Sequence, residues 1–411
     1  MKIDRIIPAV IAVSSILLFG CPPKETTSAG GAPAVEEIAI GHLASMTGGQ
    51  ATFGQQTDQG IKLALEEINA KGGVKGRQIR VITEDTQSKQ EEAANAASKL
   101  ISRDNVTAIL GEIASSNSLA AGPIAQLAKI PMISPGSTNP AVTEKGDYIF
   151  RICFIDPYQG EALANYVATE MKLKRAAILR DVRSDYSMGL SDYFKNTFTK
   201  LGGKIVVDSS YSGGDSDFKS QLTTIKGAKP EVIFVPGYYT EIGQIAVQAR
   251  DLGITVPLVG GDGWESPKLI EIGGKSLEGS FYSNHYHVDD PTPAVRNFVV
   301  AYRKKYGTTP DAMAALGYDS MKLLAAAMER ASSLDGPVLR DEIAKSAGFQ
   351  GVTGTITLGP DRNPLNKKLV VLEIKDGKLV LRATVDPAAA AVAPAETATA
   401  TTTETAAPAT K

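Results

Sequence analysis

The sequence has few residues of the kinds that bind metals or form disulfides. Its 411 residues include two cysteines and three histidines. No H-E-x-x-H, C-x-x-C or G-x-S-x-G motif accompanies them. His285 and His287 are two residues apart, which predicts that both lie exposed on one strand face rather than at a metal site. We therefore expect no enzyme, no metal and no cofactor.

The chain also lacks an excess of charge of either sign. It has 43 Lys and Arg residues against 45 Asp and Glu residues, a formal net charge of -2. A basic surface that binds a phosphate backbone is therefore not expected, and we predict no nucleic-acid partner. An apolar content of 43% is enough for buried cores, and the length allows two ordinary domains with extensions.

The apolar run at residues 6–19 is shorter than the ~20 residues of a membrane-spanning helix. It follows Lys2 and Arg5 and ends at Gly20-Cys21. A charged start, a short apolar segment and a small-residue exit are typical of a signal peptide. We predict that residues 1–20 are a signal peptide and that the protein is exported.

The two cysteines have different predicted fates. Leu18-Phe19-Gly20-Cys21 resembles the bacterial lipobox, whose cysteine becomes the lipidated first residue of the mature protein. We predict that Cys21 carries a lipid and tethers the protein to a membrane, at the periplasmic or cell-surface side. The alternative is an ordinary signal peptide with an incidental cysteine. Cys153 lies in an apolar run, which predicts a buried thiol and no disulfide.

Both ends of the remaining chain are poor in large apolar residues. Residues 21–36 are small and polar after Cys21, and residues 387–411 are almost wholly Ala, Thr, Pro and Glu. Such segments bury too little surface to fold. We predict a tether, a folded body ending near residue 386, and a disordered tail.

Within the body, short β-rich runs alternate with amphipathic helical stretches. Residues 38–43, 79–82 and 107–110 precede helical periodicity at 55–70, 90–102 and 116–128. The alternation starts afresh after residue 155, with runs at 176–179, 204–207, 232–235 and 257–260. This pattern predicts an α/β fold of two doubly wound parallel sheets. Ligands of such sheets bind beyond the carboxyl ends of the strands.

Four motifs make a family resemblance visible: GHLASMTG at 41–48, ALEEINAKGG at 64–73, GEIASS at 111–116 and ISP at 133–135. In this order and spacing they resemble the type I periplasmic binding proteins of branched-chain amino acid ABC importers. The resemblance implies two lobes joined by a three-crossing hinge. Lobe 1 would span residues 37–155 and 287–360, and lobe 2 residues 156–286 and 361–386. The implied partners are a small amino-acid-like ligand and an ABC permease with its separate ATPase.

The resemblance also implies where one lobe holds the ligand carboxylate. Ser115 and Thr138 would bind it, Gly136 would turn its carbonyl to the ammonium, and Ser137 lies in the same motif. The position of Ser115 supports this role, because it falls between a strand and a helix, where free N–H groups favour an anion. The alternatives are a helix N-cap for Ser115 and turn chemistry for Thr138.

The other lobe would supply the acid and aromatic rings. Asp262 falls where the family places an acidic residue, often a glutamate, for the ligand ammonium; the alternative is an Asp-Gly turn. Tyr186, Tyr238 and Phe53 match positions that wall the ligand, although each ring is equally compatible with a core.

Trp264 and Tyr318-Asp319 depart from the branched-chain pattern, which leaves the ligand open. We predict an amino-acid-binding transport receptor, branched-chain or similar. A ligand-sensing lipoprotein, a binder of a related amide or small organic acid, and an enzyme of unfamiliar chemistry remain as alternatives.

Overall fold

The structure, a computed structural model, describes residues 37–387. The predicted signal peptide, the Cys21 tether and residues 388–411 of the predicted tail lie outside the described residues. No helix in the described range is both long and apolar enough to cross a bilayer.

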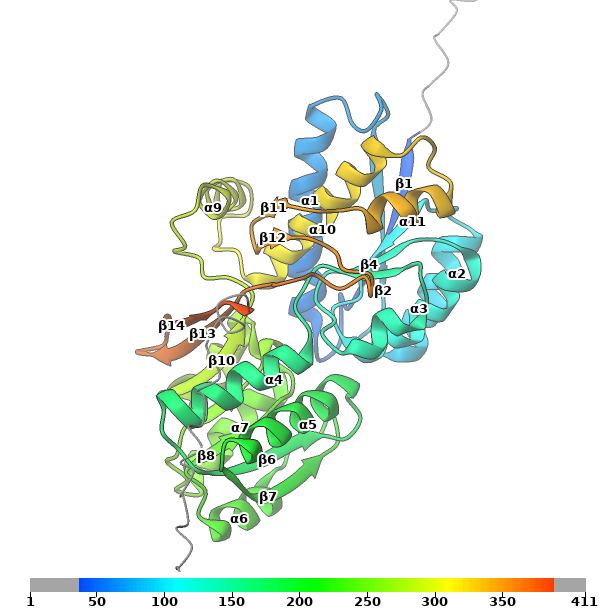
Figure 1. Cartoon of the computed structure of the whole chain (residues 1–411). Helices are drawn as coiled ribbons and strands as arrows, with labels where there is room; N and C mark the ends of the chain where they lie inside the picture. The colour runs from blue at the N-terminus through cyan, green and yellow to red at the C-terminus, as the bar shows by residue number, and fades with distance from the viewer. Residues whose placement is uncertain (1–36, 388–411) are drawn as a thin grey trace, which may run out of the picture. The chain divides into compact units, whose positions relative to one another are not determined.

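The first sheet has five parallel strands in the order β2-β1-β3-β4-β5 (Figure 1). The strands are β1 (Ile38–Ala44), β2 (Ile79–Asp85), β3 (Ala108–Leu110), β4 (Met132–Ser134) and β5 (Ile149–Arg151). Helices α1 (Ala51–Ala70), α2 (Gln90–Ser102) and α3 (Ser115–Ala128) and the 3-10 helix η1 (Pro140–Lys145) connect them. We call this sheet and its helices the first lobe.

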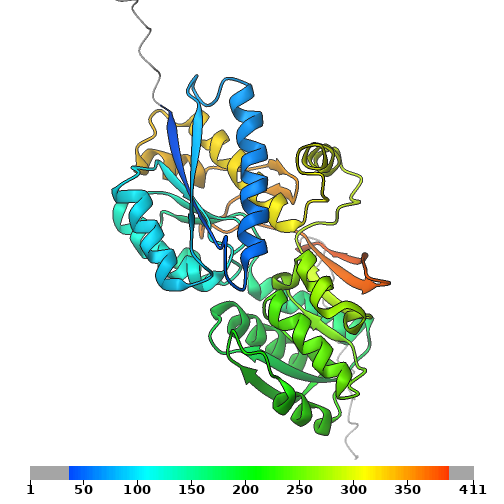
Figure 2. The same ribbon diagram turned by 180° about the vertical axis from the view of Figure 1, so that it is seen from behind.

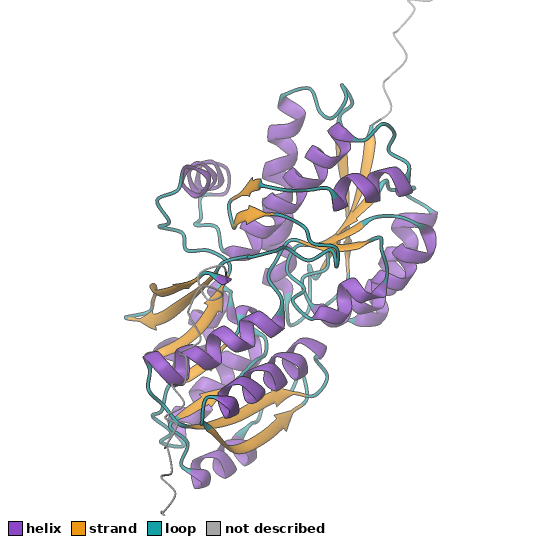
Figure 3. Ribbon diagram, in the orientation of Figure 1, coloured by secondary structure: helices purple, strands orange, loops and turns teal. Residues whose placement is uncertain are grey.

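Side chains alternate between the two faces of this sheet, as the period of a strand requires. Ile38 and Ile40 of β1 belong to the core that includes residues of α1, whereas Ala39 and Leu43 belong to the core that includes α2 and α3. Helices therefore cover both faces, as Figure 3 shows by colour. Because both faces are buried, β1, β3 and β4 read as nearly continuous apolar runs, whereas the edge strand β2 carries charged residues and is mostly half-buried.

The second sheet has seven strands in the order β14-β13-β10-β9-β8-β6-β7. They are β6 (Arg175–Asp181), β7 (Lys204–Tyr211), β8 (Val232–Phe234), β9 (Leu258–Gly260), β10 (Ser280–Asn284), β13 (Leu369–Lys375) and β14 (Lys378–Val385). Its helices are α4 (Asp156–Asn165), continued by η2 (Tyr166–Glu170), then α5 (Asp185–Lys200), α6 (Lys219–Ala228), α7 (Tyr239–Asp251), η3 (Asp262–Trp264), α8 (Pro267–Gly273) and η4 (Gly274–Leu277). This is the second lobe.

The last two strands of the second sheet differ from the all-parallel prediction. β13 pairs antiparallel with β10, and β14 pairs antiparallel with β13. Asp376-Gly377 forms the two-residue turn between them, with positive φ at both residues, which suits a tight hairpin. The sheet is therefore mixed at one edge, while β6 to β10 are parallel.

The chain passes between the two sheets three times. The segments that connect them are residues 152–155 after β5, residues 285–292 after β10, and residues 357–368 before β13. The lobe boundaries at 155, 287, 360 and 386 stay a prediction.

The middle of the chain returns to the first lobe after β10. It forms α9 (Pro293–Tyr306), α10 (Ala312–Arg330), α11 (Gly336–Ala344) and the hairpin of β11 (Phe349–Gly351) and β12 (Gly354–Ile356). Helix α10 lies against α1, and Figure 2 shows α1 from the other side. Their approach needs glycine, because a Cβ on Gly60 would lie 1.9 Å from the Ala314 carbonyl oxygen.

Candidate ligand-binding site

A narrow cavity lies where the carboxyl ends of strands from both sheets meet. Of the eight predicted ligand residues, all except Ser137 line it. The lining residues are Phe53, Ile113, Ser115, Gly136, Thr138 and Met313 from the first lobe and Tyr186, Tyr238, Asp262 and Gly263 from the second.

Ser115 is the first residue of α3, and Ala114 is its N-cap. The N-cap alternative for Ser115 is therefore wrong, and its Oγ instead accepts the Asn139 N–H at 3.2 Å. The first N–H groups of a helix have no partner within the helix, and the helix dipole adds positive potential there. This end of the cavity therefore suits an anion such as a carboxylate.

The Arg151 side chain supports the loop that carries Thr138. Arg151 is fully buried, and its guanidinium donates to the carbonyl oxygens of Ser137 at 2.6 Å and Asn139 at 2.8 Å. Ser137 turns its hydroxyl away from the cavity, toward the carbonyl oxygens of Glu112 and Ile113, both at 3.0 Å. Ser137 thus belongs to the support of the loop, and Thr138 is presented to the cavity.

Glu112 supports the other loop, and sequence reasoning did not single it out. Its Oε2 accepts the N–H groups of Ile113 at 2.7 Å and Ala114 at 3.1 Å. Its Oε1 accepts the hydroxyls of Ser45 at 2.8 Å and Thr86 at 2.5 Å. A buried carboxylate with this many donors fixes the backbone that leads to Ser115.

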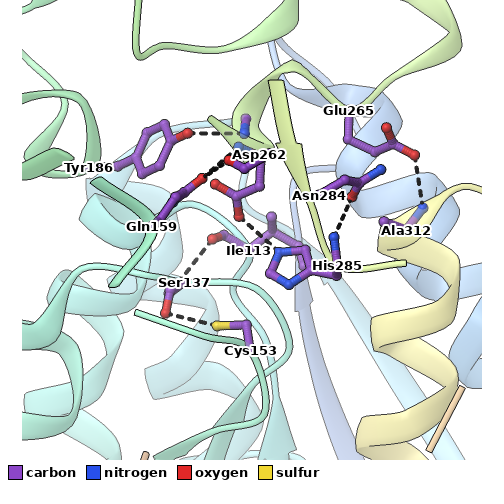
Figure 4. A network of polar contacts seen from close by, with 12 residues as sticks. Ile113, Ser137, Cys153, Gln159, Tyr186, Asp262, Glu265, Asn284, His285 and Ala312 are labelled. Carbon is purple, nitrogen blue, oxygen red and sulfur yellow. Dashed lines mark hydrogen bonds and ion pairs between the residues drawn. The ribbon is translucent and has the colours of Figure 1, made fainter. Parts of the chain in front are cut away.

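Asp262 provides the acidic end of the cavity from the 3-10 turn η3. It is 3% exposed, its backbone N–H donates to Gln159 Oε1 at 2.9 Å, and its Oδ2 lies 2.9 Å from His285 Nε2. Its Oδ1 has no partner among the described residues. Figure 4 shows His285 and Gln159 reaching Asp262 from different elements.

The prediction that His285 is exposed is wrong. His285 is buried, and its ring stacks on Phe154 with centroids 4.0 Å apart. It follows β10 in the second connecting segment, so the i, i+2 spacing did not describe a strand face. His287 is half-buried, with its Nε2 3.4 Å from the Leu379 carbonyl oxygen.

Asp156 is a second buried acid that sequence reasoning missed. Burial, and then the neighbouring Asp262 carboxylate, raise the pKa of Asp156 to about 8. The Thr138 hydroxyl and Gln159 Nε2, the latter at 3.1 Å from Oδ1, bond its carboxyl group. Asp156 is therefore protonated at neutral pH.

Aromatic rings form one wall of the cavity. Tyr186 and Tyr238 stack with centroids 5.4 Å apart, and Phe53 meets Tyr238 edge-on at 5.7 Å. Burial raises the pKa of both tyrosines above the ordinary range. Tyr186 Oη accepts the Gly263 N–H at 3.1 Å, and a Cβ on Gly263 would lie 2.5 Å from a carbonyl oxygen. Aromatic faces and the aliphatic Ile113 and Met313 suit an apolar side chain beside a cation.

The residues that depart from the family pattern do not line the cavity. Trp264 is buried and donates its indole N–H to the Val235 carbonyl at 2.9 Å. Tyr318 donates to Glu67, and both Asp319 oxygens accept N–H groups, from Val352 and Thr353. Asp319 thus anchors the β11–β12 turn, which removes the reason to treat it as a ligand residue.

Hydrogen bonds cross between the lobes around the cavity. Thr240 Oγ1 donates to the Gly49 carbonyl at 2.7 Å, and the Thr52 N–H donates to Tyr239 Oη at 3.1 Å. Such bonds form only where the two lobes are in contact, so this is a closed arrangement of the cleft.

Cys153 is fully buried, as predicted, and burial raises the pKa of its thiol to about 12. It is thus unsuited to nucleophilic chemistry. Within residues 37–387 no group of three His, Cys, Asp or Glu side chains is arranged to hold a metal.

Two α/β lobes with three connections and a small, closed cavity between them define a solute-binding protein. The periplasmic binding protein family model matches residues 37–378. An amino acid binding protein of Pseudomonas aeruginosa is 31% identical over 78% of this chain and 86% of its own length. A leucine binding protein of Thermotoga maritima is 41% identical, covers 86% of this chain and 99% of its own, and superposes with a TM-score of 0.82.

A substrate binding protein of a branched-chain amino acid transporter from Streptococcus pneumoniae, solved with isoleucine, is 34% identical, with a TM-score of 0.81 over 86% of this chain and all of its own. The chain belongs to the type I periplasmic binding proteins of the branched-chain amino acid family. The predicted α/β fold with two parallel-sheet lobes is thereby confirmed.

Proposed function

We propose that the protein captures a small amino acid, branched-chain or similar, between its lobes and delivers it to an ABC importer. One observation carries the proposal. The cavity has helix N–H groups and hydroxyls at one end, at Ser115 and Thr138, and a buried carboxylate at the other, at Asp262. A zwitterion with an apolar side chain complements this pattern, and the relatives named for leucine and isoleucine support it.

The same geometry implies that the two lobes close around the ligand. The ligand carboxylate would bind the first lobe and its ammonium the second, so a bound ligand stabilises the closed form more than the open one. The permease can then select the closed form. The family's members are solute-binding proteins for transporters rather than enzymes.

Titration calorimetry with a panel of amino acids tests the proposal. Asp262→Asn keeps the shape and removes the countercharge, so affinity should fall by about 2–5 kcal/mol. Ser115→Ala should cost about 1–3 kcal/mol, because backbone N–H groups remain. Asp192→Asn, at an exposed position of α5, is the matched control and should bind as the wild type does.

Unchanged binding in Asp262→Asn would show that the ligand has no ammonium at this acid. A small organic acid or amide would then be the ligand, and the amino-acid proposal would be withdrawn. Mass spectrometry of the ligand that co-purifies with the protein separates these outcomes directly.

We further propose that Cys21 is lipidated and keeps the protein on the outer face of a membrane. Cys21→Ala should release the protein from membranes or block its processing. An unmodified, freely soluble mature wild type would contradict this. The proposal is based on the sequence Leu18-Phe19-Gly20-Cys21, which follows a short apolar run.

A further inference from the structure

The His285 ring is held on several sides behind the cavity. Its side chain is 0% exposed, with Nε2 at 2.9 Å from Asp262 Oδ2. Phe154 stacks on the ring, and the backbone N–H of His285 donates to Asn284 Oδ1 at 2.7 Å. Phe154 and His285 lie in two of the three segments that connect the lobes. The contact with Asp262 therefore joins the site to the hinge (Figure 4).

The hydrogen-bond pattern identifies the donor in this pair. His285 Nδ1 has no partner among the described residues. Because a carboxylate oxygen only accepts hydrogen bonds, the 2.9 Å contact with Asp262 Oδ2 places an N–H on His285 Nε2. Nε2–H therefore donates to Asp262 Oδ2, while Asp262 Oδ1 has no partner among the described residues.

We propose that His285 is a positioning residue of the ligand site: its Nε2–H holds one oxygen of Asp262, so that the other oxygen meets a single cationic group of the ligand. This inference rests on the proposed function, because it assumes an ammonium at Asp262. It also names the ligand class more closely, as amino acids with one cationic group. A second cation on the ligand would find no second charged acid in the cavity lining.

Other titratable groups face the pair from neighbouring elements. They are the Asp156 carboxyl of α4, the Cys153 thiol, and the hydroxyls of Tyr186 and Tyr238. Burial raises the pKa of the thiol and of both tyrosines so far that they stay neutral at pH 5–8, and Asp156 is protonated through most of that range.

The test compares three variants of the full chain by titration calorimetry with L-leucine. His285→Gln keeps an N–H donor, His285→Phe keeps a ring without one, and His287→Gln changes the half-buried neighbour. At pH 7.5 we expect His285→Phe to lose at least tenfold in affinity, and the two glutamine variants to stay within threefold of the wild type.

Binding by His285→Phe within threefold of the wild type would overturn the inference, as would a tenfold loss of affinity in His285→Gln. Either result leaves the proposed function intact if Asp262→Asn still weakens binding. 4-Methylpentanoate, which lacks the ammonium, should bind the wild type and His285→Phe equally. A difference between them for this probe would show a structural effect instead and overturn the inference.

A ligand-free measurement separates the two proposals. The chain has only three histidines, so the His285 ring signals can be assigned by NMR through the His285→Gln variant. Asp262→Asn should shift those signals and leave the His287 signals in place. Unshifted His285 signals would overturn the inference even if no amino acid binds, whereas a wild type that binds none of the panel contradicts the proposed function itself.

Discussion

The Ser116 hydroxyl of α3, in the first lobe, lies 2.7 Å from Asp185 Oδ2 at the start of α5, in the second lobe. The Ser116 hydroxyl oxygen also accepts the Asp185 backbone N–H at 3.0 Å. The Asn139 side-chain amide donates to the Asp185 carbonyl oxygen at 2.8 Å. The start of α5 in the second lobe is thus bonded to the start of α3 and to the Asn139 loop of the first lobe, beside the cavity.

Ser116→Ala should weaken ligand binding about three- to tenfold, because the lost bond acts only in the closed form and Asp185 is exposed to water. Solution scattering of the ligand-free variant should show a larger radius of gyration. Ser98→Ala, which removes a hydroxyl bonded within α2, is the control. Equal affinity and equal scattering in Ser116→Ala and the wild type would contradict the expectation.

Arg151→Met should lower the free energy of unfolding by about 2–5 kcal/mol, because the carbonyl oxygens of Ser137 and Asn139 would lose a buried donor. Urea denaturation measures the change. Arg103→Met at the exposed end of α2 should change it by less than about 0.5 kcal/mol. A similar small loss in Arg151→Met would mean that the loop rearranges to satisfy its carbonyls.

Asp156 should make stability depend on pH. Its folded pKa of about 8 lies above the value of 3.8 for a solvated aspartate. Between these values the native chain holds a proton that the unfolded chain has released, so stability falls as pH rises, by at most about 1.4 kcal/mol per pH unit. Above pH 8 the effect is constant.

Asp156→Asn has no proton to lose, so its stability relative to the wild type should rise steadily from pH 5 to pH 8. Urea unfolding at four pH values measures this difference. The exposed Asp192→Asn should differ from the wild type by the same amount at each pH. A parallel pair of curves for Asp156→Asn would show that Asp156 is ionised in the native protein.

Deletion of residues 388–411 should leave the melting temperature and ligand affinity nearly unchanged, because an Ala/Thr/Pro-rich segment buries little surface. Calorimetry of the shortened chain measures both quantities. A drop of several degrees would show that this segment packs on the folded body.

Local signals in the sequence grouped seven of the eight candidate residues around one cavity. Apolar runs at β3, β4, β8 and β9 end in polar or glycine-rich residues, so Ser115, Thr138, Tyr238 and Asp262 could be placed at strand ends. Helix α2 was predicted with the bounds Gln90–Ser102, while α1 begins four residues earlier than expected, at Ala51. The side chain of the N-cap residue Gln50 makes no capping hydrogen bond, so the sequence carried no signal for the start of this helix.

The supporting residues could not be predicted, because their partners are distant in sequence. His285 meets Asp262 across 23 positions, and Asp262 meets Gln159 across 103. No periodicity relates such pairs. Arg151 and Glu112 lie in otherwise buried segments, where a charge is unexpected unless its partners are known. Trp264 is buried and Tyr318 packs half-buried against the core, and the sequence left both open because an aromatic ring suits a core or a ligand wall equally.

The pairing of β13 with β10 has a consequence for how the protein is made. Residues 369–375 of β13 join a sheet whose first strand begins at Arg175, so the second lobe stays unfinished until β13 has been synthesised. Such distant pairing folds slowly. A chain cut short before Leu369 would present β10 as an open edge onto which other extended chains can add. The pairing of β13 with β10 thus protects the strands that are synthesised before it from such addition.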